Sequence, residues 1–370
     1  MGPTWRITRE GIGRKALHFK GKASLTLPRT PDRTGGRAVK NFLTWICAGS
    51  ALVGLFWALR WAGSLTPSVA EPVWPRVDRI EGSAAVELRY EGGETLHFDT
   101  PPQRVLPGNA AWVDYLSVLL KPERVCALPA TSEEYSRLRT ANDELTGWHD
   151  LPRFSGYGAE TVLPFEPDLV LVHAWQKPDV TALLRGEGIA IVVLPMPDHW
   201  DDIEKTLRVL GTLLSVEKRA TTVIEANRKR IVSLRRRLSA RRKLQALSYT
   251  NLGSGGSVAG AATSADILFH LAGLENVAAK AGLVGYRTLD LEGLLRMDPD
   301  VIVVDDAHSD AITPPTRAFL YAEEGLKEME AIRERRVIAL STELFTTCSQ
   351  ELLTGAERLV DELNRLEARR

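Results

Sequence analysis

The sequence predicts an α/β protein of two pseudo-symmetric lobes with a ligand cleft between them. Three observations lead to this fold class. Short aliphatic runs alternate with segments of helical spacing, one long helical tract divides them into two groups, and one phrase occurs once in each group. Continuous aliphatic strands are typically buried on both faces. We therefore expect a mostly parallel central sheet in each lobe, with helices on both sides.

The first lobe begins with residues that alternate around Gly92 and Gly93, which predicts a hairpin over 84–99. Strands and helices then alternate regularly. The clearest strands are 168–172 and 189–194, because they are almost wholly aliphatic. The other predicted elements are strands at 104–106 and 124–128 and helices at 112–120, 160–165 and 178–187.

The central tract 201–239 is predicted to be helical, with at most a break near 211–215. It contains no proline, and Ile224, Ile231 and Leu234 keep helical spacing among charged residues. A helix of this length is too long for a crossover in a small sheet, so we expect it to join the lobes. Its basic second half is interpreted as a solvated face, where cations favour the helix dipole.

The second lobe resumes the α/β order after this helix. A strand at 244–250 is followed by a glycine-rich loop at 253–260. The other predicted elements are helices at 264–272, 290–296 and 349–366 and strands at 301–304 and 336–340.

The repeated phrase reads GAETVLPFEPDLVLV in the first lobe and DLEGLLRMDPDVIVV in the second. Each copy has a glutamate, Glu160 or Glu292, with Pro-Asp beginning seven residues later and an aliphatic run after it. Both copies are read as a short helix, a turn and a buried strand. The repeat therefore indicates pseudo-symmetry between two halves of one binding protein.

The N-terminus differs in composition from the rest of the chain. Residues 41–59 carry no charge and are just long enough to span a bilayer, and ten Lys or Arg precede them. The positive-inside rule places those cations in the cytoplasm and the residues after Arg60 outside. Two interpretations remain open, namely a retained anchor and a signal peptide cleaved before Glu71.

The charges argue against nucleic acid as a partner. The 370 residues have 47 basic and 47 acidic side chains, but residues 1–70 hold 11 of the basic and 2 of the acidic ones. The remainder has 47 − 11 = 36 basic and 47 − 2 = 45 acidic side chains. A mildly acidic body is not a nucleic-acid-binding surface.

Several of these features together resemble a known family. The chain is similar to the helical-backbone (class III) periplasmic substrate-binding proteins of ABC importers for ferric siderophores, vitamin B12 or haem. The resemblance covers about residues 80–368. It rests on the segments Pro102-Gln103-Arg104-Val105, Glu123-Arg124-Val125, Asp266-Ile267-Leu268 and Ala272-Gly273-Leu274-Glu275-Asn276-Val277, together with both copies of the repeated phrase.

The resemblance implies a binding function without catalysis. In this family one glutamate of each lobe docks on arginines of the permease dimer, and by position these are Glu160 and Glu292. The location implied is the periplasm or the outer face of the inner membrane, with residues 41–63 as an anchor if they are retained. Asp114 stands where the first helix of many members has Glu, and this departure leaves the cargo less certain than the fold.

Ligand residues are expected just past the predicted strands, because open α/β sheets bind ligands at the carboxyl ends of strands. Aromatic side chains suit a large chelated ligand, and an arginine suits a carboxylate or catecholate. The predicted cargo is an Fe(III) chelate, a ferric siderophore, with cobalamin or haem as alternatives. The predicted ligand residues are Trp112, Phe154, His173, Trp175, His199, Trp200, Tyr249, Tyr286, Arg287, His308 and Phe345.

No resident cofactor or metal is predicted. The sequence has no close His pair and no Cys-x-x-Cys motif, so direct metal binding is disfavoured, and Cys126 is expected to be a buried thiol. Within the favoured interpretation, one His or Tyr remains an alternative ligand for haem iron.

Two functions of other classes remain as rivals. A metal-dependent hydrolase would need His173, His199 and His308 to converge, and the chain has no Gly-x-Ser-x-Gly, phosphate-loop or His-Glu-x-x-His motif. A membrane-anchored scaffold that has lost transport is the other rival. The predicted organisation is a basic segment at 1–40, an anchor or signal at 41–63, a linker at 64–80, a first lobe at 81–200, a long helix at 201–243 and a second lobe at 244–370.

Overall fold

The computed structural model of this chain describes residues 5–8, 74–140, 144–238, 242–253, 255–305 and 315–368. The predicted membrane segment, most of the predicted linker and His308 lie outside these ranges. Within them, no helix combines the length and the apolar composition that a membrane crossing requires. Both lobes belong to one compact unit.

Lobe one holds a parallel sheet of three strands in the order β5-β8-β9. Val105 of β5 pairs with Leu169 of β8, which pairs with Ala190 of β9. All five residues of β8 are buried, as its aliphatic sequence predicts. The elements are β5 (Val105–Pro107), α2 (Ala110–Leu119), β6 (Leu128–Pro129), α3 (Ser132–Tyr135), β7 (Arg153–Phe154), α4 (Ala159–Val162), β8 (Leu169–His173), α5 (Pro178–Gly186) and β9 (Ala190–Leu194).

Lobe two contains a parallel core of the same kind, β10-β14-β15. Two antiparallel strands, β11 and β13, extend this sheet on the other side of β10, and β12 pairs with the start of β10. The elements are β10 (Gln245–Asn251), β11 (Gly256–Ala259), α8 (Ser264–Leu271), β12 (Glu275–Asn276), α9 (Val277–Lys280), β13 (Tyr286–Leu289), α10 (Leu291–Met297), β14 (Val301–Asp305), α11 (Thr316–Ala322), α12 (Glu330–Arg333), β15 (Val337–Leu340), α13 (Thr342–Phe345) and α14 (Glu351–Ala368).

The prediction of a loop over 253–260 was wrong for residues 256–259, because Gly256–Ala259 form strand β11. Glycine is required there for a steric reason. A Cβ on Gly256 would lie 2.2 Å from the ring of the buried Tyr249, which sits on the neighbouring strand. The glycines therefore let β11 cross over this ring, and the sheet of lobe two is mixed rather than parallel throughout.

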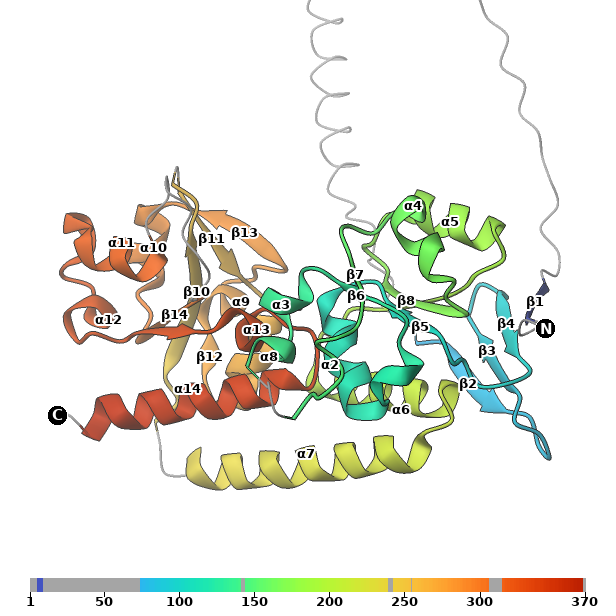
Figure 1. Cartoon of the computed structure of the whole chain (residues 1–370). Coiled ribbons are helices and arrows are strands. Elements are labelled where there is room, and N and C mark those ends of the chain that lie inside the picture. The colour runs from blue at the N-terminus through green and yellow to red at the C-terminus, as the bar shows by residue number, and fades with distance from the viewer. Residues whose placement is uncertain are drawn as a thin grey trace, which may run out of the picture. The chain divides into compact units, whose positions relative to one another are not determined.

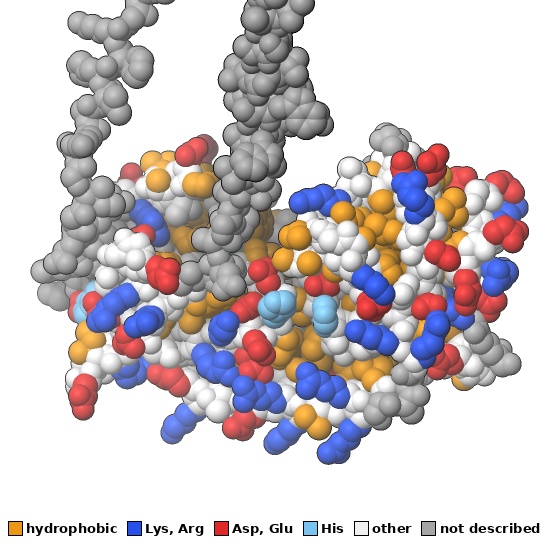
Figure 2. Space-filling view, turned by 180° about the vertical axis from the view of Figure 1, so that it is seen from behind, with side chains coloured by type: hydrophobic (Ala, Val, Ile, Leu, Met, Phe, Trp, Pro, Cys, Tyr) orange, Lys and Arg blue, Asp and Glu red, His pale blue; other side chains and the backbone are white. Residues whose placement is uncertain are grey.

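The helical tract between the lobes forms two helices, α6 (Trp200–Leu213) and α7 (Glu217–Leu238). The chain turns between them at Ser215, which has a φ of 56°. Gly211 lets the helices approach closely, since a Cβ there would lie 2.7 Å from that of Ala220. α7 runs along the lower edge of both lobes in Figure 1. Its Lys and Arg side chains belong to the blue row along the same edge in Figure 2.

A small antiparallel sheet precedes lobe one, in the order β1-β4-β3-β2. Its strands are β1 (Trp5–Thr8), β2 (Arg76–Arg79), β3 (Val86–Arg89) and β4 (Thr95–Phe98). The predicted hairpin corresponds to β3 and β4. The first strand of this sheet, β1, pairs antiparallel with β4.

Candidate functional site

Both copies of the repeated phrase build the same local structure. The carboxylate of Asp168 accepts hydrogen bonds from the backbone N–H groups of Gln103 at 2.6 Å and Arg104 at 2.9 Å, just before β5. The carboxylate of Asp300 accepts from the N–H of Gln245 at 2.8 Å, where β10 begins. Each aspartate thus fixes the start of the neighbouring parallel strand, which explains why Pro-Asp occurs in both lobes.

The residue before each Pro-Asp has a left-handed backbone. Glu166 has a φ of 44° and Asp298 a φ of 37°. This conformation ends each short helix and turns the chain back into the sheet. The repeat therefore encodes a complete helix, turn and strand unit, and it fixes the direction of the helix in each lobe.

Glu160 and Glu292 lie in the first turns of α4 and α10. Both side chains are exposed. The Glu292 carboxylate has Arg296 as a neighbour at 3.7 Å, and this exposed pair contributes little to stability. α4 and α10 lie at the upper edge of the two lobes in Figure 1, opposite to α7. The two predicted docking acids therefore lie in equivalent, solvent-exposed positions.

Exposed aromatic side chains lie beside the strand ends. Trp175 follows β8 and is 64% exposed, and its indole Nε1 donates to the sulfur of Met196, which follows β9, at 3.2 Å. In lobe two, Tyr286 is 60% exposed at the start of β13. Burial is the main cause that raises the pKa of Tyr286, and a hydrogen bond with Ser264 opposes this shift.

Asp305 influences the pKa of Tyr286 and also that of a residue that the sequence did not single out, Tyr135 of lobe one. The Asp305 carboxylate lies at the end of β14 and accepts from the hydroxyl of Thr342 at 2.7 Å. It contributes to the raised pKa of both tyrosines, although burial is the larger cause in each case. Tyr135 is 38% exposed at the end of α3. Its only sequence signal is its position between the second and third predicted strands.

Other predicted ligand residues lie in the protein interior. Trp112 has no exposed surface and stacks on His173, with ring centroids 4.3 Å apart. Burial lowers the pKa of His173 to about 3, so its ring is neutral. These two side chains belong to the interior of lobe one and present almost no surface to a ligand.

The hydrogen bonds of His173 also fix its tautomer. Asn109 uses its side-chain oxygen to accept from Ala111 N at 3.1 Å, so its Nδ2 donates to His173 Nδ1 at 2.9 Å. Because Nδ1 accepts a hydrogen bond, Nε2 carries the proton. In this tautomer neither ring nitrogen has a free lone pair for iron.

Tyr249, Phe154 and Phe345 are also buried, at 1%, 4% and 5% exposure. The hydroxyl of Tyr249 has no hydrogen-bond partner, and burial raises its pKa. The sequence placed these aromatics correctly near strand ends, but it did not reveal which way they point. A fold with two packed layers over each sheet turns most large aromatic side chains inward.

The remaining predicted residues are more exposed. His199 precedes α6 and is exposed, and Trp200 is half-buried with its Nε1 donating to Glu204 at 3.4 Å. Arg287 is exposed and donates to the backbone oxygen of Tyr286 at 2.9 Å. The described residues contain no group of three or more His, Cys, Asp or Glu side chains arranged for a metal ion. Cys126 is a free thiol but is half-buried instead of fully buried as expected, and burial raises its pKa to about 11.

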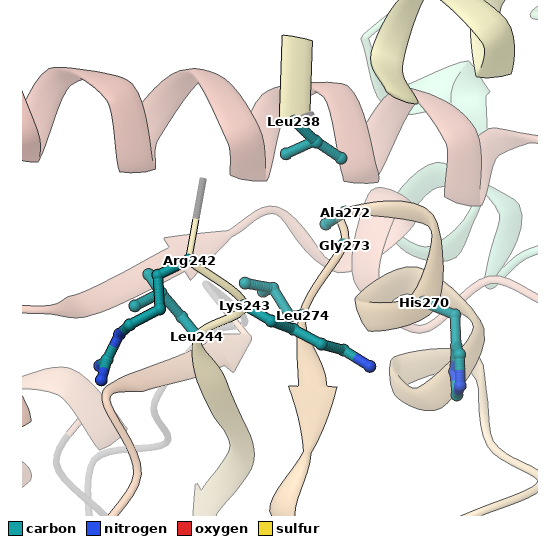
Figure 3. A pocket seen from close by; sticks show the side chains of 8 residues that line it. All are labelled: Leu238, Arg242, Lys243, Leu244, His270, Ala272, Gly273 and Leu274. Atoms are coloured by element: carbon teal, nitrogen blue, oxygen red, sulfur yellow. The ribbon is translucent and has the colours of Figure 1, made fainter. Parts of the chain in front are cut away.

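None of the predicted ligand residues lines the cavities of about 300, 590 and 910 Å³ that lie among the described residues. One of about 300 Å³ lies where α7 ends against lobe two, and it has Arg242, Lys243 and His270 in its lining. Figure 3 shows Arg242 and Lys243 extending in opposite directions. Arg242 instead donates to Asp300 at 2.6 Å. The cations of this cavity therefore do not converge on one ligand position.

Comparison with known proteins agrees with this architecture. The family model of the periplasmic binding proteins matches residues 140–344, which is more than half of the chain. An uncharacterized ABC transporter substrate-binding lipoprotein of Bacillus subtilis, YvrC, is 20% identical over 210 residues. That alignment covers 55% of this chain and 64% of the relative, so it spans less than two thirds of that protein.

Solved structures show the same fold at low sequence identity. A periplasmic haem-binding protein from Roseiflexus sp. RS-1 has a TM-score of 0.62 and 22% identity, covering 71% of this chain and 98% of that one. A periplasmic haem-binding protein from Pseudomonas aeruginosa has a TM-score of 0.60 and 24% identity, with coverage of 70% and 92%. A protein of an Fe³⁺-hydroxamate transport system from Saccharomonospora viridis has a TM-score of 0.59 and 21% identity, with coverage of 75% and 98%.

Two α/β lobes, a helical connection and one exposed acid at the same place in each lobe define a two-lobed binding protein. The chain belongs to the periplasmic binding protein family, in the type whose lobes are joined by a long helix. This confirms the family and the fold class that the sequence predicted.

Proposed function

We propose that this protein is the extracytoplasmic substrate-binding component of an ABC importer. The observation that carries the proposal is the paired placement of Glu160 and Glu292 in equivalent exposed turns of the two lobes. Two carboxylates on separate lobes suit two basic sites on a permease dimer, because such a dimer presents the same surface twice. The protein acts by binding and delivery, without catalysis.

The proposed cargo is an iron complex, and a ferric siderophore comes first. Trp175, Tyr286 and Arg287 are the exposed residues that would contact it, since exposed rings and a guanidinium suit a large anionic chelate. The Fe³⁺-hydroxamate transport protein has the same fold, which supports this choice.

Haem is the second candidate, because two of the similar solved structures are described as haem-binding proteins. His173 is a poor iron ligand in its observed tautomer. Tyr135 and Tyr286 are better placed, since both are exposed and belong to different lobes.

Docking is tested by reversing the charge of each acid in turn, Glu160→Lys and Glu292→Lys, with the matched reversal Glu225→Lys on α7. Uptake in membranes that contain the permease should fall about tenfold or more for the first two variants, because each places a cation against a basic site. Cargo affinity should stay unchanged, and Glu225→Lys should take up cargo normally. Loss of affinity in the two variants, or an equal loss of uptake in all three, would contradict the docking role.

The cargo is tested by tryptophan-fluorescence titration with ferric hydroxamates, ferric catecholates and haem, each beside its iron-free form, and with cobalamin. We expect saturable quenching by a ferric siderophore and a smaller signal in Trp175→Phe. Saturation by haem or cobalamin would replace the cargo and leave the docking role in place. No response from the folded protein to any of these ligands would remove the iron-complex proposal.

A further inference from the structure

The contact between the two lobes includes a buried polar junction. It joins α2 of lobe one to residues 347–350 of lobe two, which precede α14. The hydroxyl of Tyr115 donates to the backbone oxygen of Cys348 at 2.9 Å, and Gln350 Nε2 donates to the backbone oxygen of Asp114 at 2.9 Å. The lobes are therefore connected here directly, as well as through α7.

The carboxyl group of Asp114 lies at the centre of this junction and is completely buried. Its Oδ1 accepts from the backbone N–H of Arg137 at 2.8 Å. Its Oδ2 lies 2.8 Å from Thr347 Oγ1 and 2.8 Å from Ser349 Oγ. The two hydroxyl oxygens also lie 2.8 Å from each other. Three oxygen atoms of two lobes thus form a triangle with hydrogen-bonding distance along every side.

A hydrogen along each side of this triangle requires three hydrogens, and an ionised carboxylate supplies none. Thr347 and Ser349 bring one hydroxyl hydrogen each, which satisfies two of the three sides. When Asp114 is protonated, its own hydrogen satisfies the third side. When it is ionised, two hydroxyl oxygens remain close together without a hydrogen between them. The geometry therefore matches the neutral acid better than the carboxylate.

Burial and a neighbouring acid also favour the neutral form of Asp114, and together they outweigh the hydrogen bonds that favour its carboxylate. Burial is the first cause that raises the pKa of Asp114, to about 7, and the nearby Glu351 of α14 is the second. The backbone N–H of Arg137 and the two hydroxyl groups oppose this shift. The guanidinium of Arg137 forms ion pairs with Glu144 at 3.0 Å and with Glu351 at 3.6 Å. The other titratable groups at the junction, Cys348 and Tyr115, have raised pKa values and are neutral near pH 7.

A cavity lies close to this buried acid. A cavity of about 910 Å³ lies between α7, α14 and lobe one, and Arg137, Gln350 and Glu351 are part of its lining. The side-chain oxygen of Gln350 has no hydrogen-bond partner, since its nitrogen is the atom that donates to Asp114. Only one residue, Gln350, would separate water in this cavity from Asp114, so protons could exchange over a short distance.

We propose that Asp114 is a positioning residue that holds the two lobes in one arrangement through its ring of hydrogen bonds with Thr347 and Ser349. Ionisation removes one hydrogen from the ring and places a charge beside Glu351, so the contact between the lobes loosens. The proposal concerns the isolated protein and does not depend on which cargo it binds. Through the lobes, Asp114 also sets the separation of Glu160 and Glu292.

The sign of the pH dependence follows from linkage. The pKa of Asp114 is higher in the folded protein than its ordinary value near 4. Between these two values the folded state binds more protons than the unfolded state, so stability falls as pH rises through this window. We therefore expect the firmest junction in mildly acidic solution and a looser one above pH 7.

The test measures the distance between spin labels at Glu187→Cys in lobe one and Glu328→Cys in lobe two by pulsed EPR. Both positions are exposed. The chain has three cysteines, and Cys47 is replaced by serine in every protein that is labelled. The other two native thiols react slowly, because burial raises the pKa of Cys126 to about 11 and that of Cys348 to about 12. The parent protein without added cysteines measures any labelling of these native thiols. The distance distribution should be narrow at about pH 5.5 and at least about twofold broader at about pH 8.

Two variants separate positioning from simple packing. Asp114→Asn keeps the size and a donor but cannot ionise, so its distribution should be the same at both pH values. Asp266→Asn is the matched control, since Asp266 is a buried acid whose partner Asn276 lies in the same lobe, and its distribution should still respond to pH. Circular dichroism verifies that both variants are folded. A wild-type distribution that is insensitive to pH, or an Asp114→Asn variant that still titrates, would overturn the proposal.

Discussion

The two lobes share a three-stranded parallel core and differ in what surrounds it. In both, a Pro-Asp turn precedes the central strand and an exposed glutamate lies in the helix before that turn. Lobe two adds the antiparallel strands β11 and β13, whereas lobe one has α5 and the stacked pair of Trp112 and His173. The shared part holds the two exposed acids in equivalent places, while the part beside the proposed cargo position differs between the lobes.

The largest loss of stability should come from Gly256→Ala, because this variant disrupts β11, a strand that distinguishes lobe two from lobe one. The new Cβ would lie 2.2 Å from the ring of Tyr249, a buried side chain, so the ring or the strand would have to shift. We expect a loss of about 3 kcal/mol in the free energy of unfolding, measured with urea. Gly186→Ala in α5 is the control, because no atom lies within 4 Å of its new Cβ, and it should be neutral or slightly stabilising. Equal stability of both variants would show that β11 is not packed against Tyr249 as described.

A smaller effect tests how equivalent the two Pro-Asp turns are. Asp168→Ala leaves two backbone N–H groups without their acceptor, whereas Asp300→Ala leaves one, together with the exposed Arg242. We expect losses of about 2 kcal/mol and about 1 kcal/mol respectively in urea unfolding. A larger loss for Asp300→Ala would mean that lobe two depends more on its turn than the hydrogen bonds indicate.

The smallest of the three effects concerns the buried imidazole of lobe one. Because the pKa of His173 is lowered to about 3, the unfolded chain binds a proton at higher pH than the folded protein does. Stability should therefore fall with acidification, by about 1 kcal/mol between pH 6.5 and pH 5.5 for this residue. His173→Gln should lose this part of the pH dependence. An unchanged pH profile in a folded His173→Gln variant would show that another group is responsible.

The sequence predicted the elements whose residues follow a regular hydrophobic spacing or belong to the repeated phrase. The strands at 168–172 and 301–304 were readable because aliphatic runs are a local signal. For the helical tract the sequence allowed a break near 211–215 without requiring one, and the structure has a turn there at Ser215. Strand β11 was missed because Gly256 is required by a ring on another strand, and this requirement appears only once the two strands are paired. Local composition indicated a loop in that position.

The candidate site was less predictable than the fold for a related reason. Distance along the chain from a strand end identifies the right region, but it does not show whether a side chain points outward, as Trp175 does, or inward, as Trp112 does. The junction at Asp114 depends on Thr347 and Ser349, which are more than two hundred residues away in the sequence. Neither hydroxyl residue lies in a recognisable motif, so only the folded arrangement reveals their common partner.

The placement of α7 has a practical consequence for how the molecule orients itself near charged materials. α7 has eight Lys or Arg residues and two acidic residues, Glu217 and Glu225, and it runs along the edge opposite to α4 and α10. A molecule with a basic edge and two protruding acids on the other side has an electric dipole along that axis. Adsorption on an anionic support such as mica or sulfonated beads should therefore leave Glu160 and Glu292 facing solution. Oriented immobilisation for single-molecule work would then need no affinity tag.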